Sequence, residues 1–206
     1  MVSHIVGAAF GVAALALCVV FSAVRGDVWA VVSSGIYGGS LVLLYTMSCI
    51  YHGLSDRVPT AKKVMQVMDH CAIYALICGS YTPILLCAVR RVSPGWGWGL
   101  FGVVIGLCGL CTVFTAIDLH KYAPLSMFCY VGVGWSVVFA IKPVLASVPL
   151  PGILWLVGGG IAYSLGAVLY VRGGRRGSAA YTHSVFHLFV LLGSICHFFC
   201  IFFYVI

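Results

Sequence analysis

Two histidines one helical turn apart, His183 and His187, begin the last apolar stretch of the sequence. Residues at positions i and i+4 share one face of a helix, so both imidazoles can point at the same ion. Histidines with this spacing bind zinc in other helical sites. A third histidine from a neighbouring helix would leave one tetrahedral position open, which is the pattern of a catalytic rather than a structural zinc.

A second pair with the same spacing, Ser48 and His52, ends an earlier apolar stretch, and Asp69 begins the next one. His52 can supply the third imidazole. Asp69 could hold or deprotonate a water molecule at the open position, where zinc can lower the pKa of water to about 7. Ser48 could bond to that water or orient Asp69. Hard cations prefer several carboxylates, so a single acid among histidines favours Zn2+.

Each of these residues also has a simpler explanation. An isolated HxxxH in a helix is usually a chance or interfacial pair. Ser48 could be a packing residue bonded to its own helix, and Asp69, which opens a span, could be a helix N-cap. Because polar groups inside a membrane are costly and by default indicate function, the metal interpretation depends on whether these side chains lie at one depth.

The elements that must position them follow from composition. The chain has 206 residues, of which 63% are hydrophobic and 7% charged, and its mean hydropathy is +1.14. Soluble domains carry roughly 45–50% apolar and about 25% charged residues, so lipid must be the solvent. A spanning helix needs about 20 apolar residues, and seven stretches qualify: Ile5–Val24, Val28–Tyr51, Met68–Val89, Trp96–Ala116, Leu125–Ile141, Ile153–Val171 and His183–Ile206. The sequence therefore predicts an all-α fold, a seven-transmembrane helix bundle in one domain, residues 1–206.

Basic residues in the short loops predict the orientation, because cytoplasmic loops carry more lysine and arginine. With the N-terminus in the cytoplasm, seven such residues face inward and four outward: Arg57, Lys62, Lys63, Lys121, Arg172, Arg175 and Arg176 against Arg25, Arg90, Arg91 and Lys142. The N-terminus is thus predicted to be cytoplasmic and the C-terminus to lie on the opposite side. In this topology Ser48, His52, Asp69, His183 and His187 all reach the cytoplasmic boundary.

The excess of basic residues does not indicate nucleic-acid binding. The net charge of +7 is split among short loops, which suits anionic lipid headgroups, so membrane lipids are the predicted partners. The ten cysteines lie in or at the ends of apolar stretches, where a thiol acts as a small hydrophobe. Cys108 and Cys111 form a CxxC without neighbouring cysteine or histidine ligands, and we interpret them as packing residues.

The remaining histidines are assigned lesser roles. His70 points about 100° away from its neighbour Asp69 on a helix and is interpreted as interfacial. His120 is expected in a loop and His4 is a terminal residue. His197, deep in the last span, is expected to line the bundle as a hydrogen-bonded side chain rather than to bind the metal.

Two backbone features are expected to shape the bundle. Pro83 lies inside the third apolar stretch and is predicted to kink it, because proline lacks an N–H group. Gly102 and Gly106 form a GxxxG-type pair. Such pairs let helices approach closely, so this one indicates packing rather than function.

Three stretches carry a family likeness. Tyr45–Leu54 (YTMSCIYHGL), Met68–Pro83 (MDHCAIYALICGSYTP) and Thr182–Phe199 (THSVFHLFVLLGSICHFF) resemble hemolysin III proteins, and the likeness extends over essentially the whole chain. Those proteins are grouped with the progestin and adiponectin receptors, in a proposed superfamily of membrane hydrolases that includes alkaline ceramidases.

The resemblance implies a seven-helix bundle with its N-terminus inside and a zinc ion near the cytoplasmic face. By matching motif, His52, His183 and His187 would be the zinc ligands, with Asp69 and Ser48 as the partners on the water side. The chain lacks the extended N-terminal region and the C-terminal tail of the receptors, which favours the compact hemolysin III branch. The name of that branch records a haemolytic, pore-forming activity.

Three functions are therefore open. The first is a zinc-dependent intramembrane hydrolase of a lipid amide or ester, whose substrate enters laterally from the bilayer. The second is a pore-forming cytolysin or channel with a structural zinc site. The third, a lipid-sensing seven-helix receptor, has the least support, because no soluble signalling module is present.

Overall fold

The fold is known from a computed structural model, which describes the backbone of residues 2–175 and 179–206 and the side chains of residues 3–173 and 185–206. Within these residues every regular element is helical. The elements are α1 (Val2–Val24), α2 (Val28–Gly53), α3 (Pro59–Pro83), the π-helix η1 (Ile84–Val89), α4 (Arg90–Val92), α5 (Pro94–Ile117), α6 (Leu119–Gly134), the 3-10 helix η2 (Ser136–Ala140), α7 (Ile141–Ser147), α8 (Leu150–Arg175) and α9 (Ala179–Tyr204).

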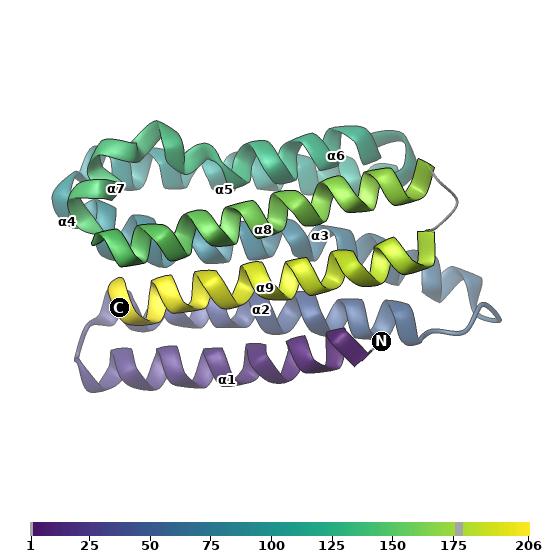
Figure 1. Ribbon diagram of the computed structural model, residues 1–206, viewed down its shortest axis with the longest axis horizontal. Coiled ribbons are helices and arrows are strands. Elements are labelled where there is room, and N and C mark those ends of the chain that lie inside the picture. The colour runs from purple at the N-terminus through teal and green to yellow at the C-terminus, as the bar shows by residue number, and fades with distance from the viewer. Residues whose placement is uncertain (1, 176–178) are drawn as a thin grey trace.

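Seven stretches of the described chain are long and apolar enough to cross a membrane: Ser3–Val24, Val28–Gly53, Pro59–Val92, Pro94–Ile117, Leu119–Ser147, Leu150–Gly173 and Val185–Tyr204. Their axes run side by side along the long direction of the molecule (Figure 1). The predicted seven-transmembrane bundle is confirmed, and the protein is a multi-pass integral membrane protein.

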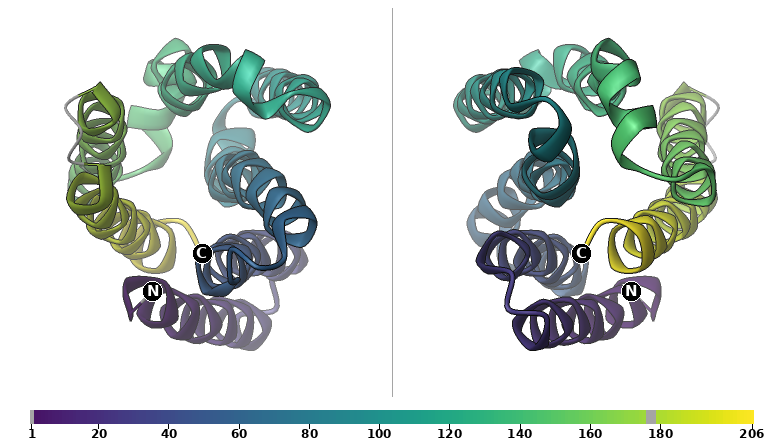
Figure 2. Two further views of the ribbon diagram at one scale, coloured as in Figure 1. Left: turned by 90° about the vertical axis from the view of Figure 1, so that its right-hand side faces the viewer. Right: turned by 90° about the vertical axis from the view of Figure 1, so that its left-hand side faces the viewer.

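The helices form a ring when viewed from either end (Figure 2). Extensive contacts join α1 to α2, α2 to α3 and α8 to α9, whereas α1 touches α9, and α6 touches α8, more sparsely. The marked N- and C-terminal ends lie at opposite ends of the bundle (Figure 1). Which end is cytoplasmic stays a prediction from the loop charges.

The third span begins earlier than its hydropathy predicts. We expected it to start at Met68, but α3 begins at Pro59, which occupies its first turn. The apolar stretch marks only the part in lipid, and the preceding turns, which carry Lys62 and Lys63, are helical outside it. Asp69 therefore lies ten residues inside α3, so the N-cap explanation of this acid is wrong.

The third and fifth spans are irregular where they face each other. After Pro83 the helix continues as the π-helix η1, so the irregularity predicted at this proline is a π-helical segment. In the fifth span, α6 gives way to the 3-10 helix η2 after Trp135. The Tyr81 hydroxyl joins the two sites: it donates to the carbonyl of Gly134 at 2.8 Å and accepts from the amide of Val137 at 2.9 Å.

Replacing Tyr81 by phenylalanine should lower the free energy of unfolding by about 1–3 kcal/mol, because it leaves buried backbone groups at the break without their partner. Unfolding in mixed detergent micelles measures this change. The matched control is Tyr122→Phe, at the half-buried start of α6, which should shift the value by less than about 0.5 kcal/mol. Equal stability of the two variants would contradict the role given to Tyr81.

Glycines decide how closely α1 approaches α2. A Cβ on Gly7 would overlap the Tyr45 ring, and a Cβ on Gly38 would overlap Leu15. By contrast, Gly102 and Gly106 face open space, so the expected packing of this pair is wrong within the described chain. Its open faces leave room for side chains, which makes these two positions useful controls.

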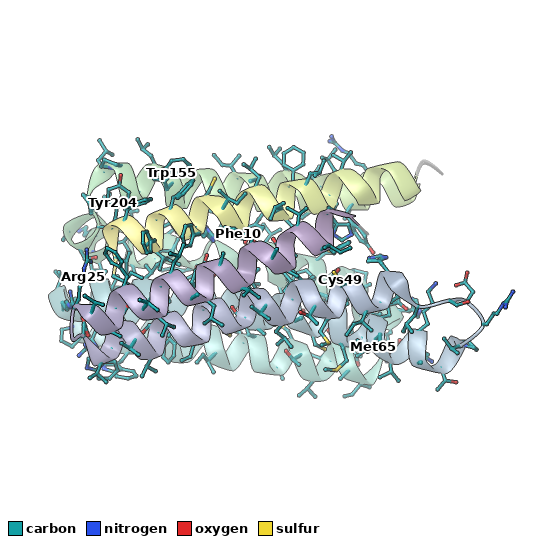
Figure 3. The ribbon with its side chains drawn as sticks, turned by 90° about the horizontal axis from the view of Figure 1, so that it is seen from below. Phe10, Arg25, Cys49, Met65, Trp155 and Tyr204 are labelled. Carbon is teal, nitrogen blue, oxygen red and sulfur yellow. The ribbon has the colours of Figure 1, made fainter. Side chains whose placement is uncertain are left out.

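The end of the bundle opposite the N-terminus is closed by polar contacts and apolar packing. Arg25 donates to the carbonyl of Ile206, and Arg91 pairs with Asp27. Arg25 and Tyr204 lie together at this end, whereas Cys49 and Met65 lie toward the other (Figure 3). The neighbouring half of the bundle is filled by fully buried side chains: Leu85, Val89, Val104, Val144 and Ile201.

Candidate metal centre and cavity

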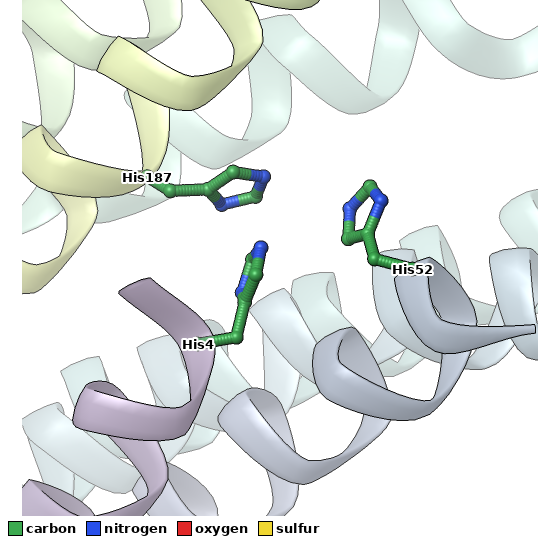
Figure 4. Close-up of side chains that lie close together, drawn as sticks. All are labelled: His4, His52 and His187. Atoms are coloured by element: carbon green, nitrogen blue, oxygen red, sulfur yellow. The ribbon is translucent and has the colours of Figure 1, made fainter. Parts of the chain in front are cut away.

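Three histidines from three helices meet at the N-terminal end of the bundle. His4 comes from α1, His52 from the last turn of α2 and His187 from α9. Their ligand nitrogens all lie within 4.8 Å of one another. The imidazole rings face one another across the space between the helices (Figure 4). Among all the histidine, cysteine, aspartate and glutamate side chains that the structure describes, these three histidines form the group that could hold a metal ion.

The rings are in direct contact. The centroids of His4 and His187 lie 3.9 Å apart, edge to face, and those of His4 and His52 lie 5.0 Å apart, stacked. His52 and His187 are 5.4 Å apart. His4 is 2% exposed, whereas the other two are half-buried. A cluster of three imidazoles, one buried and two half-buried, is the donor type that suits zinc.

Two of the three predicted zinc ligands, His52 and His187, are brought together. The third, His183, lies one turn earlier on α9, and its side chain is outside the described residues. The proposed catalytic residues Ser48 and Asp69 line one cavity with His187. The Ser48 hydroxyl lies near the Asp69 carboxylate, and its role in orienting Asp69 stays a prediction.

His4 is the candidate ligand that the sequence analysis set aside. It is a single histidine near the start of the chain, with no partner at helical spacing, so motif reasoning gives it no weight. The topology contained the missing signal. Because α1 and α9 begin at the same end of the bundle (Figure 1), the first turn of α1 had to lie at the depth of His187.

The other described histidines differ in their surroundings. His70 is half-buried and lines the cavity, where its Nδ1 atom lies 2.8 Å from the carbonyl of Gln66. His197 also lines the cavity, beside the Tyr163 ring at 5.2 Å, which agrees with the expected position. His120 is exposed in the first turn of α6, so the expectation of a loop residue is wrong.

The cavity runs from the histidines into the middle of the bundle and has a volume of about 190 Å³. For comparison, a cavity of about 150 Å³ holds a benzene ring. Polar groups mark its two ends: Ser48 and Asp69 near the histidines, and Tyr81, Tyr163 and His197 at the deep end. Between them the walls are mainly apolar, and include Leu44, Leu76, Ile77, Val131 and Val190. This arrangement suits an amphipathic ligand.

The deep end of the cavity is held by hydrogen bonds. Tyr45 and Tyr163 bond through their hydroxyls to the Ser194 hydroxyl at 2.8 and 2.9 Å. This buried network fixes α2, α8 and α9 to one another. The helices that carry His52 and His187 are therefore joined about two turns away from these histidines.

The cysteines do not form a second metal site among the described residues. All ten are free thiols. Cys78 and Cys129 lie beside Cys108 and Cys111, so the expectation that the CxxC has no neighbouring cysteine is wrong. The four come from three helices that the sequence alone does not place together. They remain buried or half-buried side chains of the core.

Comparison with known proteins shows the family of this chain. A family profile described as "Haemolysin-III related" matches residues 1–198. The chain belongs to this family. It is similar to Hemolysin-3 of Bacillus cereus, with 34% identity over 205 residues that cover 100% of this chain and 90% of the relative. The likeness to hemolysin III proteins that three stretches indicated is thereby confirmed.

Two further relatives extend the comparison. The Hemolysin-3 homolog of Bacillus subtilis is 34% identical over 203 residues, which cover 98% of this chain and 91% of that protein. The human Monocyte to macrophage differentiation factor is 25% identical over 181 residues, which cover 85% of this chain and 71% of that protein. The sequence similarity thus extends along nearly the full length of the bacterial relatives.

Proposed function

We propose that this haemolysin III-related protein is a zinc-dependent intramembrane hydrolase that cleaves an amide or ester bond of a membrane lipid. The observation that carries the proposal is the meeting of imidazoles, one carboxylate and one hydroxyl at one end of a cavity whose middle is mainly apolar. Each of these groups is costly inside a membrane, and together they form the donor set that hydrolysis requires.

The described histidines fit zinc by type and by spacing. A tetrahedral zinc with bonds of about 2.0–2.1 Å holds its nitrogens about 3.4 Å apart. The separations here are up to 4.8 Å, so small side-chain rotations would close the group around an ion. His52 and His187 would hold the metal, with His183 as a further ligand predicted from its spacing. When bound, zinc polarises a carbonyl and makes water a stronger acid.

Asp69 would move the proton in this reaction. It lies on α3 and lines the cavity together with Ser48 of α2, and its carboxylate can accept a proton from water and return it to the departing amine or alkoxide. General acid–base catalysis of this kind contributes about 10²–10⁴-fold to a rate. The Ser48 hydroxyl, which is 4% exposed, would hold the carboxylate in one orientation.

The cavity suits the acyl part of a lipid. Residues of α6 and α8, such as Val131 and Ala167, line it, and these two helices contact each other sparsely. An acyl chain already dissolved in the bilayer can pass between them without crossing water. The polar bond of the lipid would then lie among the polar groups at the histidine end.

A second candidate is a pore with a structural zinc site, because relatives carry the name Hemolysin-3. The packing inside a single chain favours the hydrolase over the pore, because the described side chains leave no continuous channel. Beyond Tyr81 and His197 at the deep end of the cavity, fully buried side chains such as Leu85, Val89 and Ile201 fill the bundle. A pore would therefore need several chains.

One experiment separates the two candidates. The purified protein is placed in liposomes that contain a trapped dye and a panel of sphingolipids and phospholipids. We expect released fatty acid, loss of this product after a chelator, its return with zinc, and retention of the dye. Dye leakage without any lipid cleavage would support the pore and contradict the hydrolase.

A further inference from the structure

The packing of α1 on α2 sets the position of His4. A Cβ added at Gly11 would lie 3.2 Å from the backbone of Leu41, and one turn earlier a Cβ at Gly7 would overlap the Tyr45 ring. The two helices are antiparallel, so each step back along α1 is a step forward along α2. Continuing this register, His4 lies opposite Ser48, one turn from His52. Glycines at these positions let the backbones approach closely, which brings the His4 ring within reach of the site.

His4 is held in place by its surroundings, although it lies in the first turn of α1. Its side chain is 2% exposed and lines the cavity. Its ring contacts both other histidines, and the contact with His187 is the shortest among the three rings. Tyr45, on which Gly7 packs, is itself held by the bond to Ser194, so α1 cannot shift easily along this surface.

We infer that His4 is itself a metal ligand, supplied by the first span to the site of His52 and His187. The three ligand nitrogens already lie within 4.8 Å of one another, and imidazole is a preferred ligand of Zn2+. The inference rests on the metal site of the proposed function. His4, from a helix that the histidine motifs do not include, takes there the third imidazole position that spacing assigns to His183, so one tetrahedral position stays open for water.

The consequence is a metal-dependent link between the first and last spans. The packing of α1 is mainly on α2, and its direct contacts with α9 are sparse. A shared ion between His4 and His187 would fix the N-terminal turn of α1 to α9 and close this end of the cavity. Metal removal should therefore loosen α1 from α9 while the α1–α2 packing at Gly7 and Gly11 persists.

The test uses Co2+ as a spectroscopic probe and Zn2+ for affinity, with the full-length protein in detergent. In His4→Ala, X-ray absorption should count one fewer imidazole per bound Zn2+, and the zinc affinity should fall at least about tenfold. In His4→Cys, bound Co2+ should gain a thiolate-to-metal charge-transfer band in the near ultraviolet. Cys49, three residues before His52, is replaced by serine in both this variant and its parent.

A pair of glycine variants tests the same ligand through its position. Gly7→Val should push α1 away from Tyr45 and reproduce the lost imidazole of His4→Ala. Gly102→Val makes the same change where the glycine faces open space, and should leave the imidazole count unchanged. This pair separates loss of the ligand from a general effect of valine in a span.

The outcomes are distinct. A lost imidazole in His4→Ala and a thiolate band in His4→Cys establish the ligand. If wild type binds zinc and His52→Ala does not, but His4→Ala keeps the count and affinity and His4→Cys shows no band, the inference fails and the proposed metal site stands. If wild type binds no metal at all, both fail.

Discussion

Replacing His187 by alanine is expected to remove stoichiometric zinc from the purified protein and to abolish lipid hydrolysis with it. Even residues that only support a metal ligand change affinity or activity by about 10–100-fold when mutated. Loss of a ligand should therefore lower the zinc affinity by more than about 100-fold. Metal analysis of protein purified without added zinc, beside hydrolysis in liposomes, measures both effects.

The controls use histidines outside the cluster. His120→Ala changes an exposed side chain at the start of α6, and His70→Ala changes a cavity residue whose Nδ1 atom lies beside the backbone of Gln66. Both should keep their zinc. If His187→Ala retained zinc at the wild-type ratio, the ion would have to be held elsewhere and the site described above would be wrong.

The architecture could be predicted from sequence because lipid imposes a simple rule. Backbone groups in the hydrocarbon must be bonded within their own segment, so long apolar stretches become helices. The rule does not predict how far a helix continues beyond the hydrocarbon into water. For that reason α3 begins at Pro59 rather than Met68, and the carboxylate of Asp69 lies inside a helix rather than at its cap.

Only the site residues that are paired within one helix could be predicted from the sequence. His183 with His187 and Ser48 with His52 are visible as i, i+4 pairs, and the predicted seven-span topology places them at one end. His4 is joined to them through inter-helix packing, by Gly7 on Tyr45 and Gly11 on Leu41. The four cysteines around Cys108 likewise come from three helices. Contacts of this kind depend on register between helices, which composition and periodicity do not determine.

The roles of metal and carboxylate can be separated, because Asp69 lies on a helix that supplies none of the three described histidines. His4, His52 and His187 come from α1, α2 and α9, whereas Asp69 comes from α3. A change at Asp69 should therefore leave the imidazoles in place. The isosteric Asp69→Asn keeps the shape of the side chain and its contact with Ser48 but removes the group that accepts a proton.

Asp69→Asn is accordingly expected to keep stoichiometric zinc and to lose about 10²–10⁴-fold in the rate of lipid hydrolysis. The matched control is Asp56→Asn, which removes the same charge in the exposed loop before α3. Lys62, by hydrogen bonding, holds the pKa of Asp56 below its usual value, so this carboxyl is ionised at neutral pH and its loss should leave hydrolysis unchanged. A rate for Asp69→Asn within about threefold of wild type would exclude Asp69 as the base.

The same pair of variants distinguishes an enzyme from a pore. If Asp69→Asn keeps its zinc and loses hydrolysis while Asp56→Asn keeps both, the protein behaves as an enzyme. Leakage through a pore with a structural ion does not need a proton acceptor, so this loss would not be expected of a pore.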